Sequence, residues 1–206
     1  MIRIIGEPLE IAQEREITFI INGVPSKFAC TPKMLKELAI GFAISEGIAE
    51  KIEDIEVKIL EDSVVIKANG VKRGFKKIEP RVKFKLEDLK RSLSLIEIEE
   101  YRKTRGYHVA VVVGRNSFFR AYDVGRHNAV DKAIGLALLN GANLEESYLL
   151  LSGRISLGIV TKCLNAGIPL VVSKAAIFDS AIEFCEKTGL SAVSFATNIA
   201  IGKAIE

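Results

Sequence analysis

Three short runs of the sequence combine glycine, serine, histidine and arginine where a strand is expected to pass into a helix. The runs are Asp123 to Asn128, Ser152 to Arg154, and Ser173 to Lys174. Glycine lets the backbone approach a ligand closely, and the start of a helix offers unpaired N–H groups to an anion. Arginine adds positive charge and binds phosphate oxygens through two hydrogen bonds. The runs therefore predict a site for a phosphate or another anion.

The same residues also fit a structural interpretation, in which Gly and Ser form short loops and the Arg side chains are solvated. One junction alone favours that interpretation. Three coincident junctions favour a shared crevice, because the carboxyl ends of parallel strands meet at one edge of a sheet. The predicted ligand-binding residues are Asp123, Gly125, Arg126, His127, Asn128, Ser152, Gly153, Arg154 and Ser173.

The two histidines are further candidates. His127 and Asp131 are one helical turn apart, so Asp131 is placed to orient or charge the imidazole. Alternatively, His127 or Asn128 caps the helix and Asp131 occupies its favourable first turn. His108 opens a strand, where it is either functional or a hydrogen-bonded core residue. Neither histidine has a Cys or His at ligand spacing, so we expect no protein-bound zinc.

Three cysteines make an odd number, at spacings unlike a zinc site or a disulfide framework. Cys163 and Cys185 lie on the apolar faces of expected helices and are predicted to be core residues. Cys30 ends an expected strand, where solvent could reach it, and it is the candidate reactive thiol.

The N-terminal half is expected to hold short strands and helices. Asn22-Gly23 predicts a tight turn within residues 15 to 30, and Thr31 is predicted to cap a helix that starts with Pro32 and ends near Gly47. The segment 69–81 is predicted to be a mobile surface loop. The other expected elements are strands at 55–60 and 64–68 and helices at 86–94 and 97–104.

From His108 onward, short apolar strands alternate with amphipathic helices, which is typical of an α/β domain with a mixed, largely parallel sheet and helices on both faces. The expected strands are 108–113, 117–123, 147–151, 168–172 and 190–196, and the expected helices are 127–139, 154–166 and 176–187. We therefore divide the chain into a small N-terminal α+β region (1–68), a segment of loop and short helices (69–104), and an α/β core (105–206).

The composition is that of an ordinary globular protein of 206 residues, with a net charge of +3. This charge is too small and too dispersed to favour nucleic-acid binding. No apolar run approaches membrane-spanning length, and the start of the sequence turns acidic at Glu7, so we expect a cytoplasmic protein.

Taken together, these segments resemble the FdhD/NarQ family, the formate dehydrogenase accessory sulfurtransferases. The most specific anchor is the run Asp123-Val124-Gly125-Arg126-His127-Asn128-Ala129-Val130-Asp131-Lys132. Other anchors are Glu7 to Ile11, Glu37 to Ile48, Thr104 to His108, Ser152 to Arg154, Ala166 to Pro169 and Ser173 to Ala181.

The resemblance implies a cytidine-deaminase-like core without its zinc, a homodimer, and two protein partners, formate dehydrogenase and a cysteine desulfurase. It also implies that sulfur from the desulfurase passes to the molybdenum bis(molybdopterin guanine dinucleotide) cofactor, which a guanine nucleotide could mimic. The family's C-terminal cofactor-contacting stretch falls on Phe195, Ala196, Thr197, Asn198, Ile199 and Ala200.

The family usually carries a Cys-x-x-Cys loop, whereas the matching region here, Ala68 to Phe75, has no cysteine. Two functions stay open: a sulfurtransferase that uses Cys30 or a partner's thiol, and a non-catalytic chaperone or paralogue that binds the cofactor or a nucleotide. A nucleotide-processing hydrolase is disfavoured, because the chain lacks metal ligands and a convincing nucleophile–base pair.

Overall fold

The structure is a computed structural model that describes residues 3–70 and 77–206. The central part of the predicted mobile loop, residues 71–76, lies outside the described residues. Among the described residues, no helix is long and apolar enough to cross a membrane.

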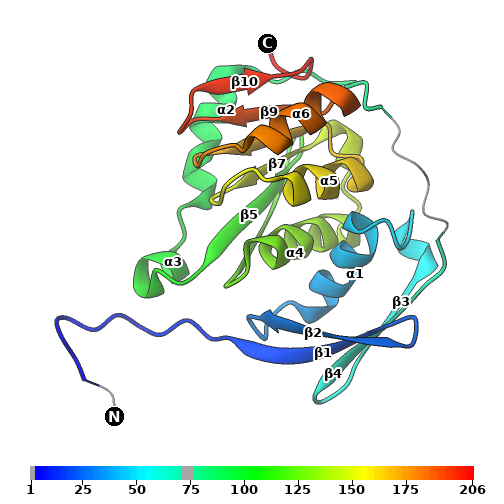
Figure 1. Ribbon diagram of the computed structural model, residues 1–206, viewed down its shortest axis with the longest axis vertical. Helices are drawn as coiled ribbons and strands as arrows, with labels where there is room; N and C mark the ends of the chain where they lie inside the picture. The colour runs from blue at the N-terminus through cyan, green and yellow to red at the C-terminus, as the bar shows by residue number, and fades with distance from the viewer. Residues whose placement is uncertain (1–2, 71–76) are drawn as a thin grey trace.

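The N-terminal region forms a four-stranded sheet in the order β2-β1-β4-β3 (Figure 1). The predicted turn joins β1 to β2 through Asn22 and Gly23, which both have positive φ angles. Strands β1 and β4 pair in parallel and thereby join two hairpins, a pairing that the sequence analysis did not predict. The strands are β1 (Arg15–Ile21), β2 (Val24–Cys30), β3 (Ile55–Ile59) and β4 (Ser63–Ala68).

The second sheet has six strands in the order β10-β9-β8-β7-β5-β6. Strands β7, β8 and β9 run parallel, and the other pairs are antiparallel, so the sheet is mixed. The strands are β5 (His108–Val113), β6 (Phe118–Asp123), β7 (Tyr148–Leu151), β8 (Leu170–Ser173), β9 (Ser191–Ser194) and β10 (Ile199–Ile201).

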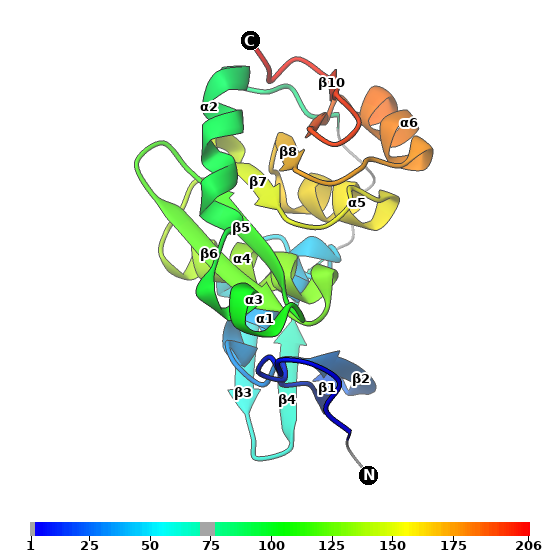
Figure 2. The ribbon, with the colours of Figure 1, turned by 90° about the vertical axis from the view of Figure 1, so that its left-hand side faces the viewer.

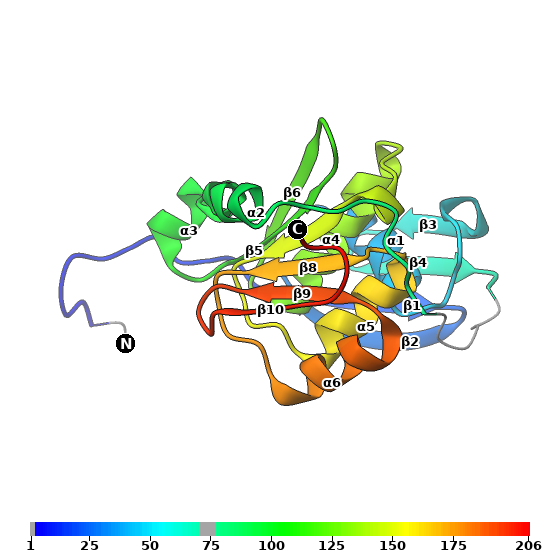
Figure 3. The ribbon, with the colours of Figure 1, turned by 90° about the horizontal axis from the view of Figure 1, so that it is seen from above.

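Helices cover both faces of the six-stranded sheet, as predicted (Figure 3). Alternate strand residues explain this, because Ala110 packs toward the face of α4, α5 and α6, whereas Val109 and Val111 pack toward α2. The helices are α2 (Leu86–Ser92), α3 (Glu99–Thr104), α4 (Arg126–Leu139), α5 (Leu157–Ala166) and α6 (Asp179–Thr188).

Helix α1 (Leu35–Ser45) lies between α4 and the small sheet (Figures 1 and 2). Two glycines allow the close approach of α1 to α4. A methyl group on Gly41 would lie 1.7 Å from the Asp131 carbonyl oxygen, and one on Gly135 would lie 2.0 Å from the Glu37 carbonyl oxygen. The two helix backbones are therefore in direct contact.

The predicted start of α1 is wrong. The helix begins at Leu35, after Met34 in a left-handed conformation, and Thr31 does not cap it. Helices α5 and α6 also begin later than predicted, at Leu157 and Asp179. The reason is that Ile155 and Ile177 first pair as an isolated bridge that keeps the chain extended beyond the ends of β7 and β8.

Candidate functional site

The strand pairing brings the three predicted junctions to one edge of the six-stranded sheet. His108 at the start of β5 pairs with Asp123 at the end of β6. Leu151 and Ser173, at the ends of β7 and β8, also pair with each other. Because β5 is antiparallel to both β6 and β7, its start lies at the same edge as their ends. The loops that follow these strands are therefore neighbours.

Two loops converge around His108. A methyl group on Gly153 would lie 3.4 Å from His108 Nδ1 and 3.5 Å from Arg126 Cβ. Arg154 follows Gly153, is exposed, and places its guanidinium 5.5 Å from the centre of the Phe178 ring. His108 and Arg126 are half-buried. We call His108, Arg126, Gly153 and Arg154 the arginine–histidine cluster.

Charge and burial keep both histidines neutral near pH 7. Burial, followed by the positive charges of Arg126 and Arg154, lowers the pKa of His108 below its usual 6.5. Burial and the ammonium of Lys162 lower the pKa of His127 in the same direction. The positive charge of the cluster at neutral pH therefore comes from the two arginines.

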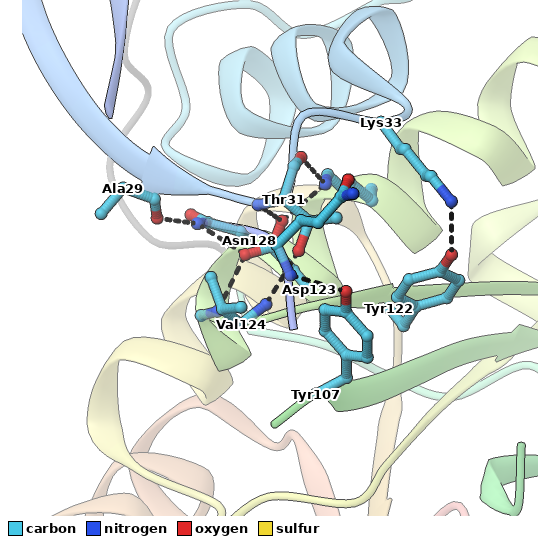
Figure 4. A network of polar contacts seen from close by, with 11 residues as sticks. Ala29, Thr31, Lys33, Tyr107, Tyr122, Asp123, Val124 and Asn128 are labelled. Carbon is cyan, nitrogen blue, oxygen red and sulfur yellow. Dashed lines mark hydrogen bonds and ion pairs between the residues drawn. The ribbon is translucent and has the colours of Figure 1, made fainter. Parts of the chain in front are cut away.

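Asp123 is the centre of a buried polar network beside this cluster (Figure 4). Its Oδ2 accepts from Lys132 Nζ at 2.5 Å and from the Thr31 amide at 3.0 Å. Its Oδ1 accepts from the Gly125 amide at 2.8 Å and from Asn128 Nδ2 at 3.1 Å. Lys132 Nζ also donates to the Thr31 carbonyl at 2.8 Å. The side chains of Asp123 and Lys132 are fully buried.

This network assigns Asp123 and Asn128 a structural role. Asp123 points into the protein, and the Asn128 amide is shared between Asp123 Oδ1 and the Ala29 carbonyl. Both side chains therefore hold the loop in place rather than extending toward a ligand. The sequence analysis missed Thr31 and Lys132, although a lysine within the apolar stretch of α4 is itself a signal of a buried ion pair.

Asp131 does not partner His127, and this prediction is wrong. Lys162 Nζ lies 2.9 Å from each Asp131 carboxylate oxygen, and Ser45 Oγ donates to Asp131 Oδ1 at 2.5 Å. Lys162 also reaches Glu46 Oε1 at 2.6 Å. In the part of the chain that the structure describes, no hydrogen bond or ion pair links Asp131 to His127. The Asp131–Lys162 network instead ties α4 to α5 and to the end of α1.

Burial and ion pairing have opposite effects on the charges of Asp131 and Lys162. Burial raises the pKa of Asp131 to about 6, against the opposing effects of Lys162 and Ser45. Burial by itself lowers the pKa of Lys162, but Asp131 and Glu46 outweigh this effect and raise it. Each partner therefore favours the charged form of the other.

His127 packs against the first turn of α5, since a methyl group on Gly158 would lie 3.0 Å from its Nε2. Neither His127 nor Asn128 caps α4, whose first residue is Arg126 and whose N-cap is Gly125. The capping alternative is therefore wrong as well.

The predicted serines serve the loops at the same edge. Ser152 Oγ accepts from the Val109 amide at 2.9 Å, and the buried Ser173 Oγ donates to the Gly153 carbonyl at 2.6 Å. Ser194, which the sequence analysis missed, donates to the Ala175 carbonyl and accepts from Thr197 Oγ1, both at 2.7 Å. The stretch Phe195 to Ala200 forms the turn and start of β10 at this edge, with Ala196 to Asn198 exposed.

Two helix starts border the cluster. In the described part of the chain, no side chain caps helix α4 at Gly125 or helix α5 at Ser156. Within residues 3–70 and 77–206, Ser156 Oγ is buried and has no hydrogen-bond partner. Free N–H groups, two arginines and an orphaned hydroxyl are the donors that a phosphate-bearing ligand requires. The cluster can therefore bind an anion, and the residues fit a phosphate group.

None of the three cysteines is exposed. Burial raises the pKa of Cys30 to about 11, raises that of Cys163 further, and raises that of Cys185 to about 12. Cys163 and Cys185 are core residues as predicted. Cys30 is fully buried as well, so the prediction that solvent could reach it is wrong. A thiol must ionise to act as a nucleophile, and these sites oppose ionisation.

Comparison with known families matches the FdhD/NarQ family over residues 12–83 and 62–201. "Protein FdhD" of Methanocaldococcus jannaschii is 36% identical, over 91% of this chain and 85% of that protein. "Sulfur carrier protein FdhD" of Shouchella clausii is 31% identical, over 94% of this chain and 88% of its own length.

The crystal structure of a candidate formate dehydrogenase accessory protein from Desulfotalea psychrophila shares the fold, with a TM-score of 0.78 and 23% identity. The similarity covers 90% of this chain and 84% of that one. On the family match and the relatives above 30% identity, this chain belongs to the FdhD/NarQ family.

Proposed function

We propose that this protein is an accessory protein of formate dehydrogenase that binds the molybdenum bis(molybdopterin guanine dinucleotide) cofactor as cargo. The observation that carries the proposal is the convergence of Arg126 and Arg154 on His108 beside two uncapped helix starts. Arg126 and Arg154 would bind phosphate groups of the cofactor. The exposed turn from Ala196 to Asn198 would contact another part of it.

The cysteines favour binding over catalysis. The names of several relatives point to sulfur transfer, the second candidate function. A sulfur carrier needs a thiolate that other molecules can reach, and the buried thiols of this chain do not meet that need. If sulfur passes to the bound cofactor, we propose that the thiol belongs to a cysteine desulfurase partner. The setting we propose is the cytoplasm, with the chain as a homodimer.

The arginine prediction tests the binding site. Guanosine diphosphate serves as the probe, with affinity measured by isothermal titration calorimetry. Because a hydrogen bond to a charged group contributes about 1.5–3 kcal/mol, the Arg126→Gln/Arg154→Gln double variant is expected to bind at least roughly 100-fold more weakly. Arg115→Gln is the matched control, since Arg115 is an exposed arginine in the turn at the opposite end of the β5–β6 hairpin. Unchanged affinity in the double variant would refute the site.

The histidine prediction tests the electrostatics. His108 and His127 are the only histidines in the sequence, so NMR can follow each ring through a pH titration, with His127→Gln to assign the signals. Both midpoints are expected below 6.5, and saturating guanosine diphosphate is expected to raise that of His108, because its phosphates offset the arginine charges. A His108 midpoint that the nucleotide leaves unchanged would place the anion elsewhere.

The sulfur prediction separates the two candidate functions. After incubation with a cysteine desulfurase and cysteine, intact mass spectrometry is expected to find no added sulfur on this chain. The Shouchella clausii relative is the positive control, treated in parallel. An added sulfur that Cys30→Ala abolishes would instead establish a carrier thiol in this protein.

A further inference from the structure

A groove lies between the N-terminal segment, α3 and the start of β5, and it has a volume of about 210 Å³. The N-terminal segment extends away from the body of the protein on the side of α3 (Figure 1). We call this groove the tyrosine groove. Its lining residues are Glu10, Ile11, Gln13, Lys33, Glu99, Glu100, Lys103, Thr104, Tyr107 and Tyr122.

The tyrosine groove is separate from the arginine–histidine cluster. Tyr122 precedes Asp123 on β6, and successive residues of a strand point to opposite faces of the sheet. Tyr122 packs with the α2-side core, whereas His108 lies next to Gly153 at the cluster. A ligand in the groove would therefore not compete directly for the cluster.

One part of the groove offers hydrogen-bond donors. The rings of Tyr107 and Tyr122 lie side by side, with centres 4.9 Å apart, and their hydroxyls point in the same direction (Figure 4). The Tyr107 hydroxyl accepts from the Gln13 amide at 3.0 Å, which leaves its own proton available. Lys33 Nζ lies 3.5 Å from the Tyr122 hydroxyl, and no carboxylate among the described residues forms an ion pair with Lys33. Together these groups suit a carboxylate.

The α3 side of the groove is acidic. Lys103 Nζ is held by Glu99 at 2.8 Å and lies 4.0 Å from Glu10, so its charge is already balanced. Glu100 has no ion-pair partner in the described chain. The lining thus carries three carboxylates against two ammonium groups, an excess that disfavours a ligand with only negative charge.

We propose that the tyrosine groove binds a free α-amino acid. Its carboxylate would accept from Lys33 and the two tyrosine hydroxyls, and its ammonium group would pair with the glutamates of α3. A zwitterion would give an oppositely charged partner to both Lys33 and Glu100, neither of which forms an ion pair with another described residue.

The experiment begins with ligand-observed NMR on the wild-type protein with each of the twenty amino acids, followed by calorimetry on those that bind. For each of these amino acids, the analogues that lack either the amino or the carboxyl group are measured in parallel. We expect saturable binding of at least one amino acid and at least tenfold weaker binding of both of its analogues. Binding of no amino acid, or equally tight binding of the carboxylate-only analogue, would overturn the proposal.

Variants locate the site. Lys33→Met and Glu100→Gln are each expected to weaken binding at least tenfold, because each removes one charged partner. Both residues are exposed, so the variants should fold, and circular dichroism checks this. Lys36→Met is the matched control, since Lys36 is an exposed lysine outside the groove. Amino-acid binding that survives both groove variants would place the site elsewhere and overturn the proposal.

Discussion

Replacement of Lys132 by Met is expected to lower the free energy of unfolding by about 3–5 kcal/mol, because it leaves the buried Asp123 carboxylate without its counter-ion. Both side chains are fully buried, and their charged atoms lie 2.5 Å apart. The substitution also removes the hydrogen bond to the Thr31 carbonyl. A loss of this size is a large share of the 5–15 kcal/mol that holds a typical domain together. Urea unfolding followed by circular dichroism measures it.

Two further variants show whether the buried charge is the cause. Lys36→Met, at an exposed position of α1, is expected to change stability by no more than about 0.5 kcal/mol. The Asp123→Asn/Lys132→Met double variant contains neither charge, so it should be more stable than Lys132→Met alone. Equal losses for Lys132→Met and Lys36→Met would show that the pair contributes little.

Local sequence patterns predicted most of the fold because each depends on near neighbours. The apolar runs over 108–113 and 117–123 match β5 and β6 to within one residue. The turn at Asn22 is equally local, since Asn and Gly tolerate positive φ. The shared edge of the junctions after Asp123, Leu151 and Ser173 also followed, because strand direction determines which ends meet. The position of His108 at that edge was not predicted.

The partners of buried charges could not be predicted in this way. Thr31 and Asp123 are 92 residues apart, and the Thr31 amide donates to the Asp123 carboxylate. The Thr31 hydroxyl, which would cap a helix, instead accepts from the Val124 amide. Asp131 looked like a partner for His127 at helical spacing, but Lys162 reaches it from another helix, 31 residues away. A rule for spacing within one helix does not capture a contact between helices. The parallel pairing of β1 with β4 was also missed, because it too joins segments that are far apart in the sequence.

Contact between the backbones of α1 and α4 connects the small sheet to the sheet edge that carries the arginine–histidine cluster. Gly41 and Gly135 face each other across the two helices, and a methyl group on either would meet backbone atoms. Backbone cannot move aside as a flexible side chain does, so the helices would have to separate. That separation would disturb Asp131, because Gly41 approaches α4 at the Asp131 carbonyl. It would also strain the hydrogen bond that Ser45, at the end of α1, donates to the Asp131 carboxylate.

Replacement of Gly41 by Ala is therefore expected to destabilise the protein by about 3 kcal/mol or more, the upper end of the cost of overpacking. The sign is informative, because Gly→Ala inside a helix with free space stabilises it by about 1 kcal/mol. Gly6→Ala is the control, since no atom of the described residues lies within 4 Å of the added methyl group. Thermal and urea unfolding measure both variants. The structure places the added methyl carbon 1.7 Å from the Asp131 carbonyl oxygen. A neutral or stabilising effect of Gly41→Ala would therefore show that α1 and α4 lie farther apart than in this structure.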